Sequence, residues 1–367
     1  MLLSAYVRSY PNQQMLRPYF FKKLNCYQNS LLLKAPKGVR FRNKFGMTIL
    51  DQPGNLLDLD LHGRKGKIVD MSFDKISILI SKINSIPTLP TVACEVINIT
   101  ANPNSSADDL TKVIIPDISL TTKLLKMANS PFFGAIKRVT SLQHAITVLG
   151  FKEVRNLVIS AVVFESFMKI EKKGKYDIGK FWKHSFICGL AAKVIATEVK
   201  KASNEFFVAG LIHDIGKLVV YITLPHEFFK LVETAKRLEF KFTAFETEKE
   251  IIGMTHDEVG MRLLKKWMFP ENLLTAVGFH HRLQETDQKS LFPVVVNIAD
   301  IFAHLYEMKT VAGVGDPVKT EILYPEIIKR AQAFGIEWAD SDLNRFQQTL
   351  AESIEKEAAA FNLFFGN

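Results

Sequence analysis

The stretch FFVAGLIHDIGK, residues 206–217, decides the fold that the sequence predicts. Its first seven residues, 206–212, are apolar or small, which is typical of a helix buried on all its faces. His213 and Asp214 follow at once, so an imidazole and a carboxylate enter the protein interior together. Because an ionised carboxylate is costly to bury without a partner, we expect Asp214 to face other polar groups in a shared cavity.

The sequence on both sides of this stretch is patterned as further helices. Apolar residues recur at helical spacing from Ile76 onward, and no alternating run of useful length predicts a strand. Ser106 and Ser141 are predicted N-caps, and Gly150 is a predicted helix end. Later predicted helices cover residues 153–167, 184–199, 316–334 and 342–361, and the apolar end 361–365 is expected to dock on the body. The sequence therefore predicts an all-α protein.

The composition is that of a globular chain. Of its 367 residues, 47% are hydrophobic and 23% are charged, which excludes a disordered or fibrous protein. Cys26, Cys94 and Cys188 are too few and too scattered for a disulfide framework, so we expect idle thiols in a reducing cytoplasm. No uncharged apolar run reaches about 18 residues, so the sequence predicts no membrane span.

The net charge of +9 is concentrated near the amino end of the sequence. Residues 1–70 contain 12 Lys and Arg but only 4 Asp, a net charge of +8, which leaves +1 for residues 71–367. We expect 1–70 to be a basic leader that is disordered or an upstream-start artefact, and dispensable for folding. A small basic accessory element and a targeting peptide are the alternatives. The nearly neutral body predicts no binding of nucleic acid by 71–367.

Several histidines and acids share the apolar context of His213 and Asp214. They are His184, His256, His280, His281 and Asp300. Imidazole and carboxylate ligands together suit iron, manganese, nickel or zinc, so we expect these side chains to converge on one or two divalent ions. A hydrogen-bonded polar cluster without a metal is the alternative. The other histidines are interpreted as ordinary hydrogen-bonded side chains: His62, His144, His226 and His304.

Four further segments accompany this order of polar residues. They are IPTLP at 86–90, PDISLTTKLLKMANS at 116–130, SLQHAITVLG at 141–150 and HDEVG at 256–260. With His184, His213-Asp214 and Asp300, they resemble the HDOD family, the HD-related output domains of bacterial signalling proteins. The resemblance covers about residues 74–285 and places the sequence in the HD superfamily of metal-dependent phosphohydrolases.

The resemblance implies a two-lobed helical fold and a set of metal ligands. The expected parts are an N-terminal lobe at 74–168, an HD-like lobe at 176–285 and a C-terminal helical extension, 286–367, packed on the HD-like lobe. His184, His213, Asp214 and Asp300 match the metal ligands of the superfamily. His256, His280 and His281 match further ligands of the related HD-GYP cyclic-di-GMP phosphodiesterases, and Lys217 matches the lysine after their HDxG motif.

Two departures from the HD-GYP enzymes bear on activity. Lys180 stands where those enzymes commonly carry a metal-binding glutamate, and Arg282-Leu283-Gln284 replaces Gly-Tyr-Pro. These departures argue against hydrolysis of cyclic dinucleotides. Because many members of the HDOD family are non-catalytic regulators, the resemblance implies a cytoplasmic regulatory module that binds a signalling partner, with a nucleotide as a further candidate ligand and little or no turnover. The alternative is a metal-dependent phosphohydrolase in which Lys217 stabilises phosphate charge.

Overall fold

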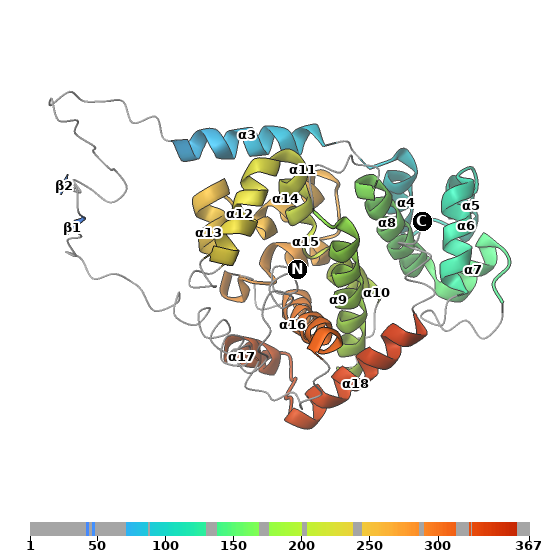
Figure 1. Ribbon diagram of the computed structural model, residues 1–367. Coiled ribbons are helices and arrows are strands. Elements are labelled where there is room, and N and C mark those ends of the chain that lie inside the picture. The colour runs from blue at the N-terminus through green and yellow to red at the C-terminus, as the bar shows by residue number, and fades with distance from the viewer. Residues whose placement is uncertain are drawn as a thin grey trace.

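The computed structural model describes residues 42–43, 46–47, 71–86, 89–129, 138–168, 176–199, 204–237, 244–285, 290–312, 323 and 325–357. The described residues form a helical protein, which confirms the predicted fold class (Figure 1). The strands among them are β1 (Arg42–Asn43) and β2 (Gly46–Met47), which pair antiparallel with Arg42 opposite Met47. The rest of the predicted leader 1–70 lies outside these ranges, as do residues 169–175 between the two predicted lobes.

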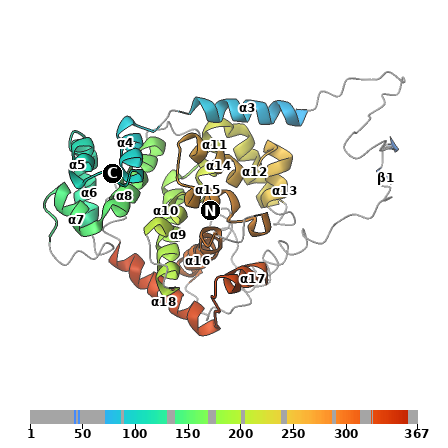
Figure 2. The same ribbon diagram turned by 180° about the vertical axis from the view of Figure 1, so that it is seen from behind.

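The N-terminal lobe is a group of helices at one end of the molecule (Figures 1 and 2). It contains α4 (Thr91–Ala101), α5 (Ala107–Ile114), α6 (Ile118–Ala128), α7 (Leu142–Leu149) and α8 (Phe151–Met168). Helix α8 packs against α4, α6 and α7, and it also contacts the next lobe through α10. The predicted ends are confirmed, because Ser106 caps α5 and Gly150, at φ +89°, follows the end of α7.

The cap of α5 gives a first prediction. The Ser106 Oγ accepts a hydrogen bond from the Asp109 amide at 3.2 Å, and the Asp109 carboxylate accepts one from the Ser106 amide at 2.9 Å. Ser106→Ala is expected to lower the free energy of unfolding by about 1 kcal/mol, because an amide of the first turn loses its acceptor. Urea unfolding measures the change, with Ser105→Ala as the control. Equal stability of the two variants would contradict the prediction.

The HD-like lobe is built around the long helix α9. Its helices are α9 (Ile178–Glu198), α10 (Asn204–Ile212), α11 (Ile215–Thr223), α12 (Pro225–Arg237), α13 (Ala244–Ile252), α14 (His256–Lys266), α15 (Glu271–Phe279) and η3 (Leu283–Glu285). Helix α16 (Phe292–Ala312), from the segment predicted as the C-terminal extension, packs on α9, α10 and α15. Helix α9 packs against both α10 and α16. Gly210 permits the close approach of α10, because a Cβ there would lie 2.7 Å from the carbonyl oxygen of Cys188.

The apolar stretch Glu205–Thr223 is long and apolar enough to cross a membrane by length and composition alone. Its most apolar window is 83% buried inside the protein, and the turn at His213 and Asp214 divides it into α10 and α11. A core helix pair of a globular domain has this composition, so the stretch is weak evidence for a membrane span.

Helix α3 (Met71–Ser85) lies along the HD-like lobe rather than within the N-terminal lobe, where the sequence analysis places it (Figures 1 and 2). Its buried side chains include Leu79 and Ile83, and the helix contacts α11, α13 and α14. At its end, the Lys266 ammonium donates hydrogen bonds to the carbonyl oxygens of Asn84 at 2.7 Å and Ile86 at 2.5 Å. The last residue of α14 thus holds the segment that leads into the N-terminal lobe.

The C-terminal helices differ in extent from the prediction. Helix α17 (Pro325–Ala333) begins at Pro325, and Leu323 lies in a bend. The prediction of one continuous helix over residues 316–334 is therefore wrong. Proline is suited to the first position of a helix because it lacks the amide that would stay unpaired there. Helix α18 (Asp340–Lys356) ends before Phe361, and it packs on α9 and α16. The predicted docking of residues 361–365 lies outside the described residues.

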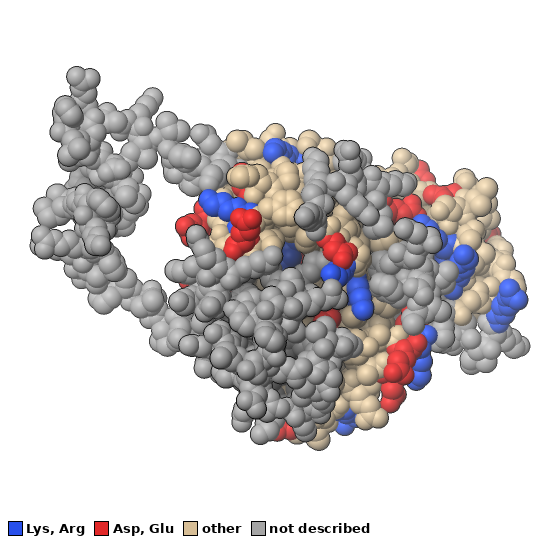
Figure 3. All heavy atoms as spheres, viewed as in Figure 1, with Lys and Arg blue, Asp and Glu red and all other residues tan. Residues whose placement is uncertain are grey.

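The described surface carries charges of both signs. On the face drawn in Figure 3, lysine and arginine side chains are interspersed with aspartate and glutamate side chains. This mixture agrees with the nearly neutral composition of residues 71–367. Of the cysteines in the described ranges, Cys94 is half-buried and Cys188 is buried, and both are free thiols.

Candidate metal centre

The predicted ligands come from separate helices and meet in the HD-like lobe. His184 lies in α9, His213 and Asp214 in the turn between α10 and α11, His256 at the start of α14, His280 and His281 after α15, and Asp300 in α16. All of them except His281 are at most 9% exposed. The fold therefore brings together every ligand that the sequence predicts.

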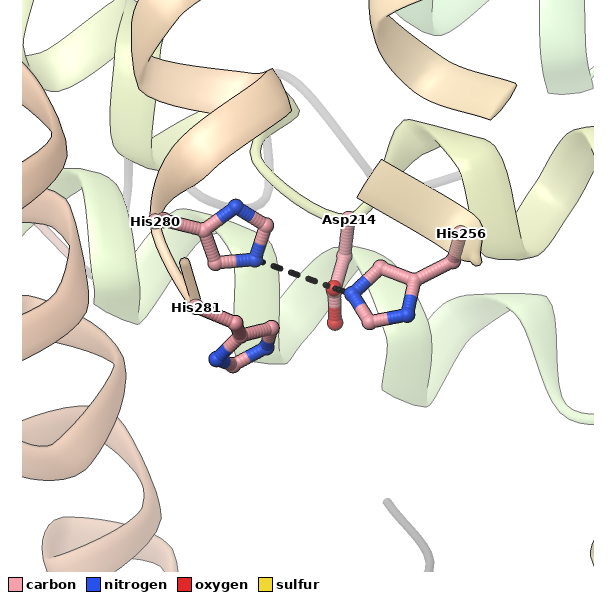
Figure 4. Close-up of side chains that lie close together, drawn as sticks. All are labelled: Asp214, His256, His280 and His281. Atoms are coloured by element: carbon pink, nitrogen blue, oxygen red, sulfur yellow. Dashed lines mark ion pairs between the residues drawn. The ribbon is translucent and has the colours of Figure 1, made fainter. Parts of the chain in front are cut away.

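Asp214 is the carboxylate around which one half of the centre is arranged (Figure 4). Its Oδ1 lies 3.2 Å from His256 Nε2 and 3.9 Å from His280 Nε2. Its Oδ2 lies 3.4 Å from His213 Nε2 and 2.5 Å from the ammonium of Lys217, one turn along α11. Both oxygens of this buried carboxylate thus face nitrogen atoms.

Asp300 is the carboxylate of the other half. Its Oδ1 accepts a hydrogen bond from His184 Nε2 at 3.0 Å and lies 3.6 Å from His213 Nε2. Since His213 Nε2 also faces Asp214, this histidine lies between the two carboxylates. The two halves therefore form one continuous polar centre.

The outer nitrogen of three imidazoles is held by a protein acceptor. His213 Nδ1 lies 2.8 Å from the carbonyl oxygen of Gly210, and His280 Nδ1 lies 2.9 Å from that of Val277. His256 Nδ1 lies 2.8 Å from Glu248 Oε1. An Nδ1–H donated to such an acceptor leaves the lone pair on Nε2, which is how ligating histidines are commonly oriented.

Several atoms at the middle of the centre are buried without an aligned hydrogen-bond partner. They are Asp214 Oδ1 and the Nε2 atoms of His213, His256 and His280. Buried polar atoms are rarely left in this state, because each costs free energy. The possible ligand atoms form overlapping sets within 4.8 Å of one another, one of Asp214, His256, His280 and His281, another of His184, His213 and Asp214. This donor set fits a divalent metal.

Charged groups of both signs shift one another's pKa values in the centre. Burial alone disfavours a charged His256, but Glu248 raises its pKa to about 10. Burial likewise opposes protonation of His184, yet Asp300 and Glu307 raise its pKa to about 9. Burial and the nearby histidines lower the pKa of His280 to about 3. Although burial opposes it, the neighbouring cations hold the pKa of Asp214 well below its usual value.

A close contact between α11 and α14 positions two of these ligands. Gly216 follows Asp214 by two residues and packs against the first residue of α14. A Cβ at Gly216 would lie 1.8 Å from the carbonyl oxygen of His256 and 2.8 Å from the amide nitrogen of Gly260. Only glycine therefore lets α11 and α14 approach closely enough for Asp214 and His256 to meet.

Three polar residues lie at the centre that were not predicted from the sequence to belong to it. Glu248 in α13 holds the His256 imidazole and also accepts from the His256 amide at 2.8 Å. His304 was interpreted as an ordinary hydrogen-bonded histidine, and its Nε2 lies 3.3 Å from Asp300 Oδ1, so it adjoins the predicted ligands. Glu307 Oε2 lies 3.4 Å from His184 Nδ1. The sequence signal for the two residues on α16 was their spacing from Asp300, because Asp300, His304 and Glu307 follow one another at i, i+4 and i+7.

The other histidines and the two departures lie elsewhere. His144 is half-buried, His226 is exposed, and His62 lies outside the described residues. Lys180 is half exposed, with its ammonium 3.4 Å from Asp177. Arg282 has a structural partner, because its Nε donates to Asp257 Oδ2 at 2.8 Å.

A comparison with protein families decides the family. The profile of the HDOD domain matches residues 86–283, which is more than half of the chain. The chain belongs to the HDOD family. The match ends before Asp300, so α16 brings part of the HDOD centre from outside the matched segment.

Several known proteins are similar to this HDOD chain. An uncharacterized protein of Treponema pallidum is 26% identical over 281 residues, which cover 76% of this chain and 52% of that protein. The chain thus spans about half the length of this relative.

Two crystal structures are similar, each 19% identical. One, by name a phosphohydrolase of Shewanella amazonensis, has a TM-score of 0.60 and covers 79% of this chain and 97% of its own. The other, by name a signal transduction protein of Marinobacter aquaeolei, has a TM-score of 0.57, with 82% and 67% covered. At this identity, the likeness shows the fold.

Proposed function

We propose that the chain is a cytoplasmic signalling module whose HD-like lobe holds one or two divalent ions of iron, manganese, nickel or zinc. The module binds a signalling partner or a nucleotide and turns over little or no substrate. His184, His213, Asp214 and Asp300 would hold one ion, and Asp214 with His256, His280 and His281 would hold the second. The similarity to a protein named for signal transduction supports the signalling role.

One observation carries the metal assignment. The Nε2 atoms of His213, His256 and His280 all lie within 3.9 Å of an oxygen of Asp214, while none of them has an aligned hydrogen-bond partner. A polar cluster that existed only for its own hydrogen bonds would satisfy these atoms. In a metal site, by contrast, the ligand atoms have no hydrogen-bond partner in the protein and all face the position of the ion.

The burial of the centre supports a module with little turnover. His213 and His280 are 0% exposed, and His184, Asp214 and His256 are each 3% exposed. Catalytic metal sites keep an open coordination position that a substrate can reach, whereas closed sites have structural roles. The chain's own side chains here enclose the centre, and acceptor oxygens face the outer nitrogens of His213, His256 and His280.

The phosphohydrolase remains the second candidate because of one group at the edge of the centre. The Lys217 side chain is 34% exposed, although its ammonium contacts the buried Asp214. A cation so placed would face a phosphate group that approached the centre. Bound divalent ions would supply an activated water and charge stabilisation for phosphate ester hydrolysis.

The variant Asp214→Asn tests the metal centre. The amide keeps the shape of the side chain but removes the anionic charge that both proposed ions share. We expect elemental analysis of the full chain, purified without a histidine tag, to find bound metal in the wild type and less than a tenth of it in the variant. Bound metal stabilises the folded state, so added metal should raise the melting temperature of the wild type only.

The matched control is Asp108→Asn, an exposed position on α5, which should retain the full metal content. Hydrolysis of a general phosphodiester substrate by the same proteins decides between the two functions. Turnover that is present in the wild type and lost in Asp214→Asn would establish the hydrolase. Equal metal contents in Asp214→Asn and the wild type would refute the centre itself.

A further inference from the structure

A group of polar residues on α16 extends the centre beyond the predicted ligands. Asp300, His304 and Glu307 follow one another at i, i+4 and i+7, so they share one face of the helix. This face packs against α9, which carries His184. His304 is a half-buried side chain, and its ring lies 4.4 Å from that of His184, centroid to centroid.

The Nε2 atoms of this group converge on a single oxygen. Asp300 Oδ1 lies 3.0 Å from His184 Nε2, 3.3 Å from His304 Nε2 and 3.6 Å from His213 Nε2. Possible ligand atoms of His184, Asp300 and His304 lie within 4.8 Å of one another. Three imidazole nitrogens therefore surround one carboxylate oxygen. Their distances from this oxygen are short enough for all four atoms to be ligands of one metal ion.

Glu307 lies on the far side of two of these rings. Its Oε2 is 3.4 Å from His184 Nδ1 and 3.9 Å from His304 Nδ1. His184 Nδ1 is a buried atom without an aligned hydrogen-bond partner. One carboxylate thus faces the outer nitrogen of both imidazoles, which is the arrangement by which acceptors fix the tautomer of ligating histidines.

We propose that His304 is a further ligand of the ion held by His184, His213 and Asp300, and that Glu307 is the residue that positions both His184 and His304. This inference rests on the proposed metal centre and adds a division of roles within it. With Asp214, three histidines and two carboxylates then surround the ion near Asp300. A shell filled by protein ligands is typical of a structural ion, whereas the ion near His256 and His281 has Lys217, whose side chain is 34% exposed, beside its Asp214 ligand.

The test is a titration of the metal-free full chain with Co²⁺, whose visible absorption reports the number and type of its ligands. We expect the wild type to bind two equivalents. His304→Gln should weaken one class of site at least tenfold and change the absorption of that class, while the other class stays intact. His256→Gln should do the reverse, and the exposed His226→Gln should change neither class.

Glu307 is tested by two substitutions. Glu307→Ala should weaken the same class as His304→Gln, by about tenfold, because both imidazoles lose their acceptor. Glu307→Gln keeps a carbonyl oxygen at this position and should therefore bind the metal more tightly than Glu307→Ala does. If Glu307 only filled space, the loss of its charge would have no part in the effect. Glu233→Gln, on the exposed face of α12, is the control.

The outcomes separate this inference from the function on which it rests. A wild type that binds no Co²⁺ would refute the metal centre and this inference with it. A wild type that binds two equivalents, with His304→Gln unchanged in titration and spectrum, would refute the role of His304 alone. Equal effects of Glu307→Ala and Glu307→Gln would refute the positioning role of Glu307.

Discussion

Replacing Gly216 with alanine is expected to cost the protein about 3 kcal/mol of stability or more. The new methyl group would lie 1.8 Å from the carbonyl oxygen of His256, so α11 and α14 would have to separate. A backbone atom cannot rotate away as a flexible side chain can. The displacement moves Asp214 away from His256, and we therefore expect the variant to lose bound metal together with stability.

Urea unfolding followed by circular dichroism measures the loss, and soluble yield replaces it if the variant does not accumulate. Gly179→Ala is the control, because Gly179 is exposed in the first turn of α9 and its Cβ would meet only the Asp177 side chain, at 3.3 Å. That control should match the wild type or gain up to about 1 kcal/mol, since alanine favours a helix. A Gly216→Ala protein as stable as the wild type would show that α11 and α14 are farther apart.

Arg282→Leu is expected to lower the free energy of unfolding by about 3–5 kcal/mol. The substitution removes the cation beside Asp257, which is 0% exposed, and leaves a buried carboxylate without its partner. Arg282 also donates a hydrogen bond to the Gly278 carbonyl oxygen at 2.9 Å, just before His280. The loss therefore loosens the end of α15 that presents His280 and His281.

The control is Arg345→Leu, since Arg345 is 53% exposed where it pairs with Glu198 and Asp342. Exposed ion pairs contribute little, so this variant should stay within about 1 kcal/mol of the wild type. Adding Asp257→Asn to Arg282→Leu should recover part of the lost stability, because the unpaired charge is then gone. A double variant less stable than Arg282→Leu alone would disagree with a charge-based cause.

The main features of the fold were predictable because they depend on local chemistry. Ser106 and Gly150 mark helix ends by capping preferences that hold in any protein. Asp214 could be predicted to face partners because burying a charge alone is costly. The start of α17 was missed because residues 316–324 include helix formers such as Lys319, Glu321 and Leu323, although proline is suited to the first position of a helix and Pro325 marks where α17 begins.

The rest of the centre depends on which helices lie side by side, and a single sequence does not contain that information directly. Glu248 lies in a helix with several other acids, and nothing local distinguishes it as the partner of His256. His304 was dismissed because a lone histidine in an apolar helix is commonplace. Its position beside His184 follows from the packing of α16 on α9.

Helix α14 connects the candidate metal centre to the junction between α3 and α4. Its first residue, His256, lies in the centre, and its last residue, Lys266, donates hydrogen bonds to carbonyl oxygens at that junction. Eleven residues of α-helix form a stiff rod about 16 Å long. A tilt of this rod at one end is a displacement at the other. A displacement of α14 at His256 would therefore also move the segment that leads into the N-terminal lobe.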